Sequence, residues 1–209
     1  MSGGTTIEKA LEQMYSNEKS SAIKTAIETW FESTDLDEEE NLKKLEDVVY
    51  CNDRSVVDMT TNGWSKDGDP FKTMEYSSTI RMTNRTPDLS CRGEVNNRDR
   101  FTYKDIVNGN GLLKWPVGLL SVDEILLAGG SNPGSNSDFY LYTGAAYWAL
   151  SPNSFFIDGT DIIFIADSGG LGHNYGINKR GVRPVISLSS SVLPNLSGTG
   201  SETDPYVVN

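Results

Sequence analysis

The chain contains a single histidine, His173, and an imidazole is the side chain best suited to exchanging protons near neutral pH. It lies in the glycine-rich stretch "GGLGHNYG" (residues 169–176). A hydrolytic triad would need a serine or cysteine activated by this histidine. The sequence has no GxSxG motif, and neither Cys51 nor Cys91 has the basic, helix-opening surroundings that activate a thiolate. We therefore expect His173 on an exposed turn and predict no catalytic residues.

Three aspartates, Asp158, Asp161 and Asp167, are close enough in sequence to suggest glycoside hydrolysis by paired carboxylates. Asp161 and Asp167 flank an apolar run that is typical of a buried strand, however. On one strand they would lie about 20 Å apart, outside the ~5–9.5 Å separation of glycosidase carboxylates. The fragment "DGTD" (158–161) is similar to part of a calcium loop but lacks its glutamate at the last position. We predict no metal site and no cofactor.

The remaining candidate chemistry is that of a binding surface. The stretch 151–179 is rich in Tyr, Asn, Ser, Asp and Gly, which adaptable binding surfaces use. The alternative is a polar, glycine-rich loop without a ligand, because many loops have this composition. The candidate ligand-contacting residues are Asn153, Phe155, Asp158, Asp161, Asp167, His173, Asn174, Tyr175, Asn178 and Lys179.

Two segments bracket this stretch, "YWALSP" (147–152) and "GVRPVISL" (181–188), and both have the composition of strands. Proline cannot donate to a β-ladder. Pro152 is therefore expected to end its strand, and Pro184 to require an edge, a bulge or an unpaired position. The expected strands are residues 139–142, 147–150, 161–166, 182–187 and a short one at 206–208.

The first fifty residues have the periodicity of helices. Thr6 can cap a first helix and Ser20 a second, and the acidic run 35–40 would begin a third that continues to Val49. Ser121 and Glu124 form a capping box for a short helix that ends near residue 129. Helices followed by short strands predict an α+β fold. The second helix carries the clearest apolar stripe, with Ile23, Ala26, Ile27, Trp30 and Phe31.

Length and charge limit the class of protein. A chain of 209 residues is enough for one sizeable domain, or for one domain with a helical appendage. Its net charge of −11 makes nucleic acid an unfavourable partner. No apolar run approaches the ~18 residues of a membrane helix, and no signal peptide is evident. We expect no membrane contact from these residues, whereas an anchor upstream of Met1 stays open.

Two cysteines and one histidine cannot complete a zinc site unless carboxylates join them. Cys51 and Cys91 are therefore either two buried thiols or one disulfide. Closing a loop of about forty residues would contribute roughly 3–4 kcal/mol in the chain-entropy model. The number of cysteines leaves both alternatives open.

"YWALSP", a strand–turn–strand segment and "GVRPVISL" together resemble the C-terminal half of C-type-lectin-like domains in bacterial surface proteins. Among C-type-lectin-like domains, the chain resembles the branch that is related to formylglycine-generating enzymes and to variable proteins diversified by retroelements. "DRFTYKDIVNGNGLLKWPVGLLSVDEILLAGG" and "YLYTGAAYWALSP" also look like exported proteins of gut Firmicutes. The resemblance covers residues 50–209. It implies that the two bracketing strands hold the core and that the stretch between them displays the ligand contacts.

The resemblance also favours a Cys51–Cys91 disulfide and an extracellular or cell-surface location. The EPN, QPD and WND motifs of calcium-dependent sugar binding do not occur. The catalytic cysteine pair of formylglycine-generating enzymes has no counterpart near the C-terminal strands. The expected organisation is an N-terminal helical region (5–49) packed on a C-type-lectin-like domain (50–209) with short twisted antiparallel strands and long loops.

The favoured function is that of an exported binding or adhesion module without catalysis, which uses the loop-rich segment 153–179 as its binding face and whose partner is an unidentified protein or glycan. One alternative is a structural or assembly component, because the stripe ending at Trp30 and Phe31 could pack on a neighbouring protein. The other is an extracellular hydrolase built around His173 or a carboxylate pair.

Overall fold

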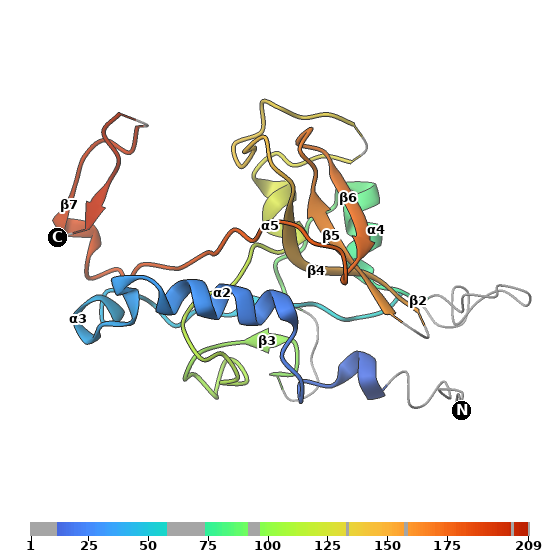
Figure 1. Ribbon diagram of the computed structural model, residues 1–209, viewed down its shortest axis with the longest axis horizontal. Helices are drawn as coiled ribbons and strands as arrows, with labels where there is room; N and C mark the ends of the chain where they lie inside the picture. Colours follow the sequence, from blue (N-terminus) through green and yellow to red (C-terminus); the bar gives the residue numbers. More distant parts are fainter. Residues whose placement is uncertain are drawn as a thin grey trace, which may run out of the picture.

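The computed structural model describes residues 12–57, 74–91, 97–132, 134–156, 159–201 and 203–208. In these ranges the chain forms helices and antiparallel sheets, which confirms the predicted α+β class (Figure 1). None of the helices they contain is long and apolar enough to cross a membrane. The elements are, in chain order, α2 (Ala22–Glu32), η1 (Asp35–Asp37), α3 (Glu39–Leu42), β1 (Tyr50–Cys51), β2 (Met74–Glu75), α4 (Ser77–Asn84), β3 (Arg100–Phe101), α5 (Val122–Leu127), β4 (Tyr147–Phe156), β5 (Gly159–Ile165), β6 (Leu171–Tyr175), η3 (Leu193–Asn195), β7 (Leu196–Ser197) and β8 (Val207–Val208).

A four-stranded antiparallel sheet with the order β2-β4-β5-β6 carries most of the predicted site residues. The prediction that Pro152 ends its strand is wrong, because β4 continues to Phe156. The pairing of β4 with β5 shifts register on both sides of Pro152. The proline therefore occupies an irregularity of the ladder, where its missing N–H is tolerated.

Both faces of this sheet are covered. On one face, Met82 of α4 and Ile125 of α5 pack in one cluster with Ile163 of β5. On the other face, Ile27 of α2 packs with Trp148 of β4. A strand that is buried from both sides has a nearly continuous apolar sequence, which is the pattern of β5.

Helix α2 confirms the main feature of the predicted apolar stripe. Ile27 and Phe31 are buried, whereas Trp30 at the edge of the stripe keeps 37% of its surface exposed. The helix begins one residue later than expected, because Ser21 is the N-cap and its Oγ accepts from the backbone N–H of Lys24 at 3.0 Å. Of the first expected helix, residues 12–15 are helical and the preceding ones lie outside the described residues.

The expected third helix is much shorter than predicted. Its range contains only the short helices η1 and α3, and a turn at residues 43–44 follows. Leu45 forms a single β-bridge with Leu188, and the backbone N–H of Glu46 donates to the Ser187 carbonyl at 2.8 Å. Pairing with a segment far along the chain thus replaces the last helical turns. The capping box of α5, from Ser121 and Glu124, is present as predicted.

Two of the expected strands are not strands. Residues 139–142 form a turn, in which the Tyr142 N–H donates to the Phe139 carbonyl at 2.9 Å. Residues 182–187 pair only at single positions, among them the bridge between Val185 and Gly118. Pro184 lies next to this bridge at an unpaired position, one of the three arrangements expected for it.

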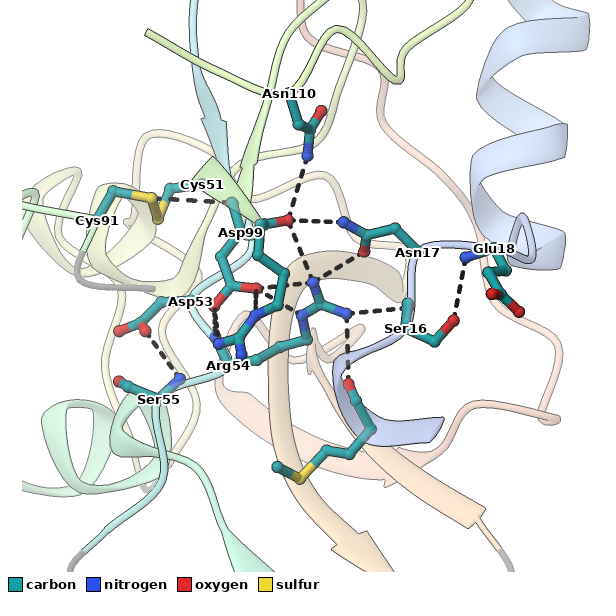
Figure 2. Close-up of polar contacts among 12 residues, drawn as sticks. Ser16, Asn17, Glu18, Cys51, Asp53, Arg54, Ser55, Cys91, Asp99 and Asn110 are labelled. Carbon is teal, nitrogen blue, oxygen red and sulfur yellow. Dashed lines mark hydrogen bonds and ion pairs between the residues drawn. A yellow bond between two sulfur atoms is a disulfide. The ribbon is translucent and has the colours of Figure 1, made fainter. Parts of the chain in front are cut away.

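Cys51 at the end of β1 forms a disulfide with Cys91, with the two Cα atoms 5.6 Å apart, as the resemblance implied. Beside it lies a buried polar cluster in which the Asp99 carboxylate accepts from the Arg54 guanidinium (Figure 2). Arg54 also donates to the carbonyls of Met14 and Ser16, at 3.3 and 3.2 Å. This cluster therefore attaches the N-terminal segment to the disulfide-bonded part of the chain.

Candidate ligand-binding site

The stretch predicted to be a soft binding loop is largely β-sheet. Residues 153–156 complete β4, β5 and β6 follow, and of the described residues in this stretch only the turn between β5 and β6 and the end after β6 are irregular. Asp158 lies outside the described residues. The other predicted site residues fall into three groups. One group is buried in the sheet, and a second lies along β6 and the turn after it. The third is Asp167 alone, in the turn between β5 and β6.

The buried group comprises Asn153, Phe155 and Asp161. The carbonyl of Asn153 accepts from the backbone N–H of Tyr76 at 3.1 Å and from the hydroxyl of Thr79. Phe155 packs in a cluster with Met14 and Tyr76. These contacts hold the sheet on the elements around it, so Asn153 and Phe155 are turned away from solvent in this structure.

Asp161 and His173 are brought together by the pairing of β5 with β6. His173 lies opposite Ile163, so it shares a face with Asp161 two residues earlier. The His173 Nδ1 lies 2.9 Å from the Asp161 Oδ2, and the histidine side chain is 52% exposed whereas the aspartate is buried. The second oxygen, Oδ1, is buried without a hydrogen-bond partner among the described residues. The imidazole is thus oriented by a carboxylate while its other nitrogen remains available to an external group.

The turn after β6 is fixed by one asparagine. The Asn174 Oδ1 accepts from the Tyr175 backbone N–H at 2.8 Å and from the Asn178 Nδ2 at 2.7 Å. The Tyr175 ring packs on Phe156, with ring centroids 5.3 Å apart. The exposed residues of β6 and this turn form what we call the β6 surface, which consists of His173, Tyr175, Ile177, Asn178 and Lys179.

Asp167 is not part of the β6 surface. It lies in the turn between β5 and β6, beyond the paired residues Ile165 and Leu171. The β6 surface lies at the other end of the same hairpin, where Asp161 pairs with Tyr175. The two predicted groups are therefore separated by the length of the hairpin.

Sequence reasoning missed two exposed apolar features. Ile177, in the turn after β6, is 91% exposed. Ile106 and Val107 are also mostly exposed, on a loop whose backbone is held by Asp105. Hydrogen bonds from the backbone and side chain of Asn108 lower the pKa of the Asp105 carboxyl. The Asn-Gly pairs of this loop, Asn108-Gly109 and Asn110-Gly111, are typical of turns, but no local pattern indicates that the apolar side chains face solvent.

No group of three or more His, Cys, Asp or Glu side chains that could hold a metal ion occurs in the described ranges. Comparisons of the chain with protein-family models, with curated proteins and with solved structures found no match.

Proposed function

We propose that the chain is an exported or surface-displayed binding module of the C-type-lectin-like kind, and that it contacts a protein or glycan ligand through the β6 surface. The observation that carries this proposal is the exposure of His173, Tyr175 and Ile177 together on one edge strand and its turn. Aromatic and apolar side chains supply contact area, and the neighbouring amide and amine groups supply hydrogen bonds.

The β6 surface is preorganised, which favours binding. His173 is held by Asp161, and the turn is held by Asn174. Side chains that are already ordered lose little conformational entropy when a ligand arrives. Strand β6 is also the edge of its sheet, so its outer backbone groups lie beside the same side chains. The disulfide fits an oxidising, extracellular compartment.

Glycan and protein arrays probed with the 209-residue chain test the proposal. For a genuine ligand, His173→Ala, Tyr175→Ala or Ile177→Ala should weaken binding by about tenfold or more, as expected for residues near the centre of an interface. The matched control is Tyr206→Ala, which removes an exposed tyrosine far along the chain. Binding that all three variants retain in full would place the ligand elsewhere.

A second candidate function, an extracellular hydrolase, is favoured by the Asp161–His173 pair. A carboxylate that orients an imidazole is also the supporting half of a hydrolytic triad. Among the described residues no serine, threonine or cysteine is hydrogen-bonded to His173, so the nucleophile would have to be water. Hydrolysis of ester or amide substrates that His173→Ala abolishes would establish this function in place of simple binding.

A further inference from the structure

Two adjoining cavities lie between the N-terminal segment 16–24 and the body of the protein, away from the β6 surface. Their volumes are about 300 and 210 Å³. The larger one is at the lower end of the ~300–1,000 Å³ range of small-molecule sites. The residues that line both cavities are Ser21, Ile23, Asn52, Arg54, Leu119 and Leu150.

The walls of the larger cavity are mainly apolar. Ile27 of α2, Tyr50 of β1, and Val117 and Leu119 are buried side chains that line it. Leu112, which is partly exposed, also lines it. Apolar walls of this kind favour an apolar molecule, because removing apolar surface from water is favourable.

Two of the three charged groups that line the larger cavity are already paired within the chain, and the third, Lys19, is exposed to solvent. The Arg54 guanidinium donates to Asp99 and, at 2.8 Å, to the Asn17 Oδ1, as Figure 2 shows. Lys24 is paired with Glu28 at 2.5 Å. A charged ligand inside the cavity would have to displace these partners, so an uncharged one fits better.

Asn52 is the exception among the polar groups of the lining. Its backbone N–H donates to the Asp99 carbonyl at 2.9 Å, which fixes the residue, but its side-chain Oδ1 is buried and accepts no hydrogen bond from the described residues. Buried acceptors in native proteins nearly always have a donor, which is another protein group, a water or a ligand. Because this oxygen has almost no accessible surface, a donor from outside the chain reaches it when the Asn52 side chain turns toward the cavities that the residue lines.

We infer that these cavities bind a small, uncharged and mainly apolar molecule that donates one hydrogen bond to the Asn52 Oδ1. The apolar part of the molecule lies against Leu119 and Leu150, and its hydroxyl or N–H group lies at Asn52. The N-terminal segment, which Arg54 holds in place, forms the outer wall. None of the residues that line the two cavities belongs to the β6 surface.

Two probes of similar size separate the apolar and the hydrogen-bonding parts of the inference, namely phenol, which has one donor, and toluene, which has none. Each is titrated into the full chain and followed by the backbone amide resonances of Asn52, Leu119 and Leu150. Both probes should shift these resonances. Phenol should bind about three- to tenfold more tightly, in line with the net contribution of one hydrogen bond.

Two variants assign the site. Asn52→Leu keeps the shape of the side chain and removes the acceptor, so it should abolish the preference for phenol over toluene. Leu112→Trp places a larger side chain at the cavity and should weaken both probes about tenfold, as expected when the apolar volume is filled. Leu127→Trp on α5 is the matched control, because Leu127 is similarly exposed and lines neither cavity.

The result that overturns the inference is an absence of shifts at millimolar phenol and toluene, or shifts that Leu112→Trp leaves unchanged. Equal affinity of the two probes for the unmodified chain would overturn the role of Asn52. If Asn52→Leu fails to fold, as judged by its melting curve, Leu112→Trp and its control still decide whether the cavity is the binding site.

Discussion

Arg54 is buried and Arg81 is largely buried, but different kinds of partner hold the two arginines. Arg81 of α4 is bound by two carboxylates, Asp123 and Asp53. Arg54 shares one carboxylate, Asp99, with Arg98 and otherwise donates mainly to backbone carbonyls. The Arg81 cluster thus has one positive and two negative groups. The Arg54 cluster has two positive groups and one negative group.

The Arg81 cluster connects three elements of the protein body. Its Nε and Nη2 donate to the two oxygens of Asp123 at 2.7 and 2.9 Å, and Nη2 also lies 2.9 Å from Asp53. Asp123 belongs to α5 and Asp53 follows β1. Burial by itself would lower the pKa of Arg81, but the hydrogen bonds and charges of Asp123 and Asp53 raise it. The guanidinium therefore stays charged and holds α4 against α5.

The Arg54 cluster reaches a segment that is distant in sequence. Besides Asp99, which is fully buried, Arg54 bonds the side chain of Asn17 and the carbonyls of Met14 and Ser16. Arg98 lies over the ring of Tyr15, 3.9 Å from its centroid. This cluster therefore anchors the N-terminal segment, and the outer wall of the inferred cavity depends on it.

The two clusters meet at consecutive residues, because Asp53 belongs to one and Arg54 to the other. Their opposite net charges therefore lie next to each other and compensate. The comparison indicates that a buried arginine with two carboxylates can lose one and remain paired. Two arginines that share one carboxylate both lose their carboxylate partner when it is removed. Removing Asp99 should therefore destabilise the protein more than removing Asp123.

The largest effect is expected from Asp99→Ala, because it leaves the guanidinium groups of Arg54 and Arg98 without their carboxylate. Breaking a buried ion pair by removing one partner costs about 3–5 kcal/mol. The free energy of unfolding is measured by urea denaturation with the disulfide intact. The control is Glu39→Ala, which removes one partner of the exposed Glu39–Lys43 pair and should change stability by at most about 0.5 kcal/mol. Equal losses in the two variants would contradict the role of Asp99.

A smaller loss is expected from Asp123→Ala, because Arg81 keeps its contact with Asp53. Asp123→Ala removes the hydrogen bonds that the Arg81 guanidinium donates to Asp123. This loss should lower the free energy of unfolding by about 2–3 kcal/mol in the same urea experiment. The loss should appear as a cooperative shift of the whole unfolding curve, since Arg81 joins α4 and α5 across the core. A loss as large as that of Asp99→Ala would show that the number of carboxylates does not decide the cost.

The parts of the fold that could be predicted are those set by neighbouring residues. The capping box of Ser121 and Glu124 lies within one helical turn, and the buried Ile27 and Phe31 share one face of α2. The apolar run of β5 is likewise a local pattern. Each of these signals is complete within a few residues, so it can be recognised in the sequence without knowledge of the tertiary structure.

The parts that could not be predicted depend on distant residues. The third helix ends early because Leu45 pairs with Leu188, and β4 passes Pro152 because its pairing with β5 shifts there. In the candidate site, the exposure of His173 was expected, but its carboxylate partner Asp161 follows from the register of β5 and β6. Neither arginine was conspicuous, because every one of its carboxylate partners in these clusters is distant from it in the sequence.

The smallest and most local effect is expected from Asn17→Ala. This change removes the Arg54 Nη2 bond to Asn17 and the Asn17 Nδ2 bond to the Arg98 carbonyl, but it leaves every carboxylate in place. The N-terminal segment should open more easily by about 1–2 kcal/mol, since a typical hydrogen bond contributes roughly 0.5–1.5 kcal/mol and two part-exposed ones are lost. Hydrogen exchange should therefore accelerate in residues 12–24 and stay unchanged in β4 and β5, because opening one segment does not require global unfolding. The same acceleration throughout the sheet would show that the two clusters act as one unit and that the contrast between them has no energetic basis.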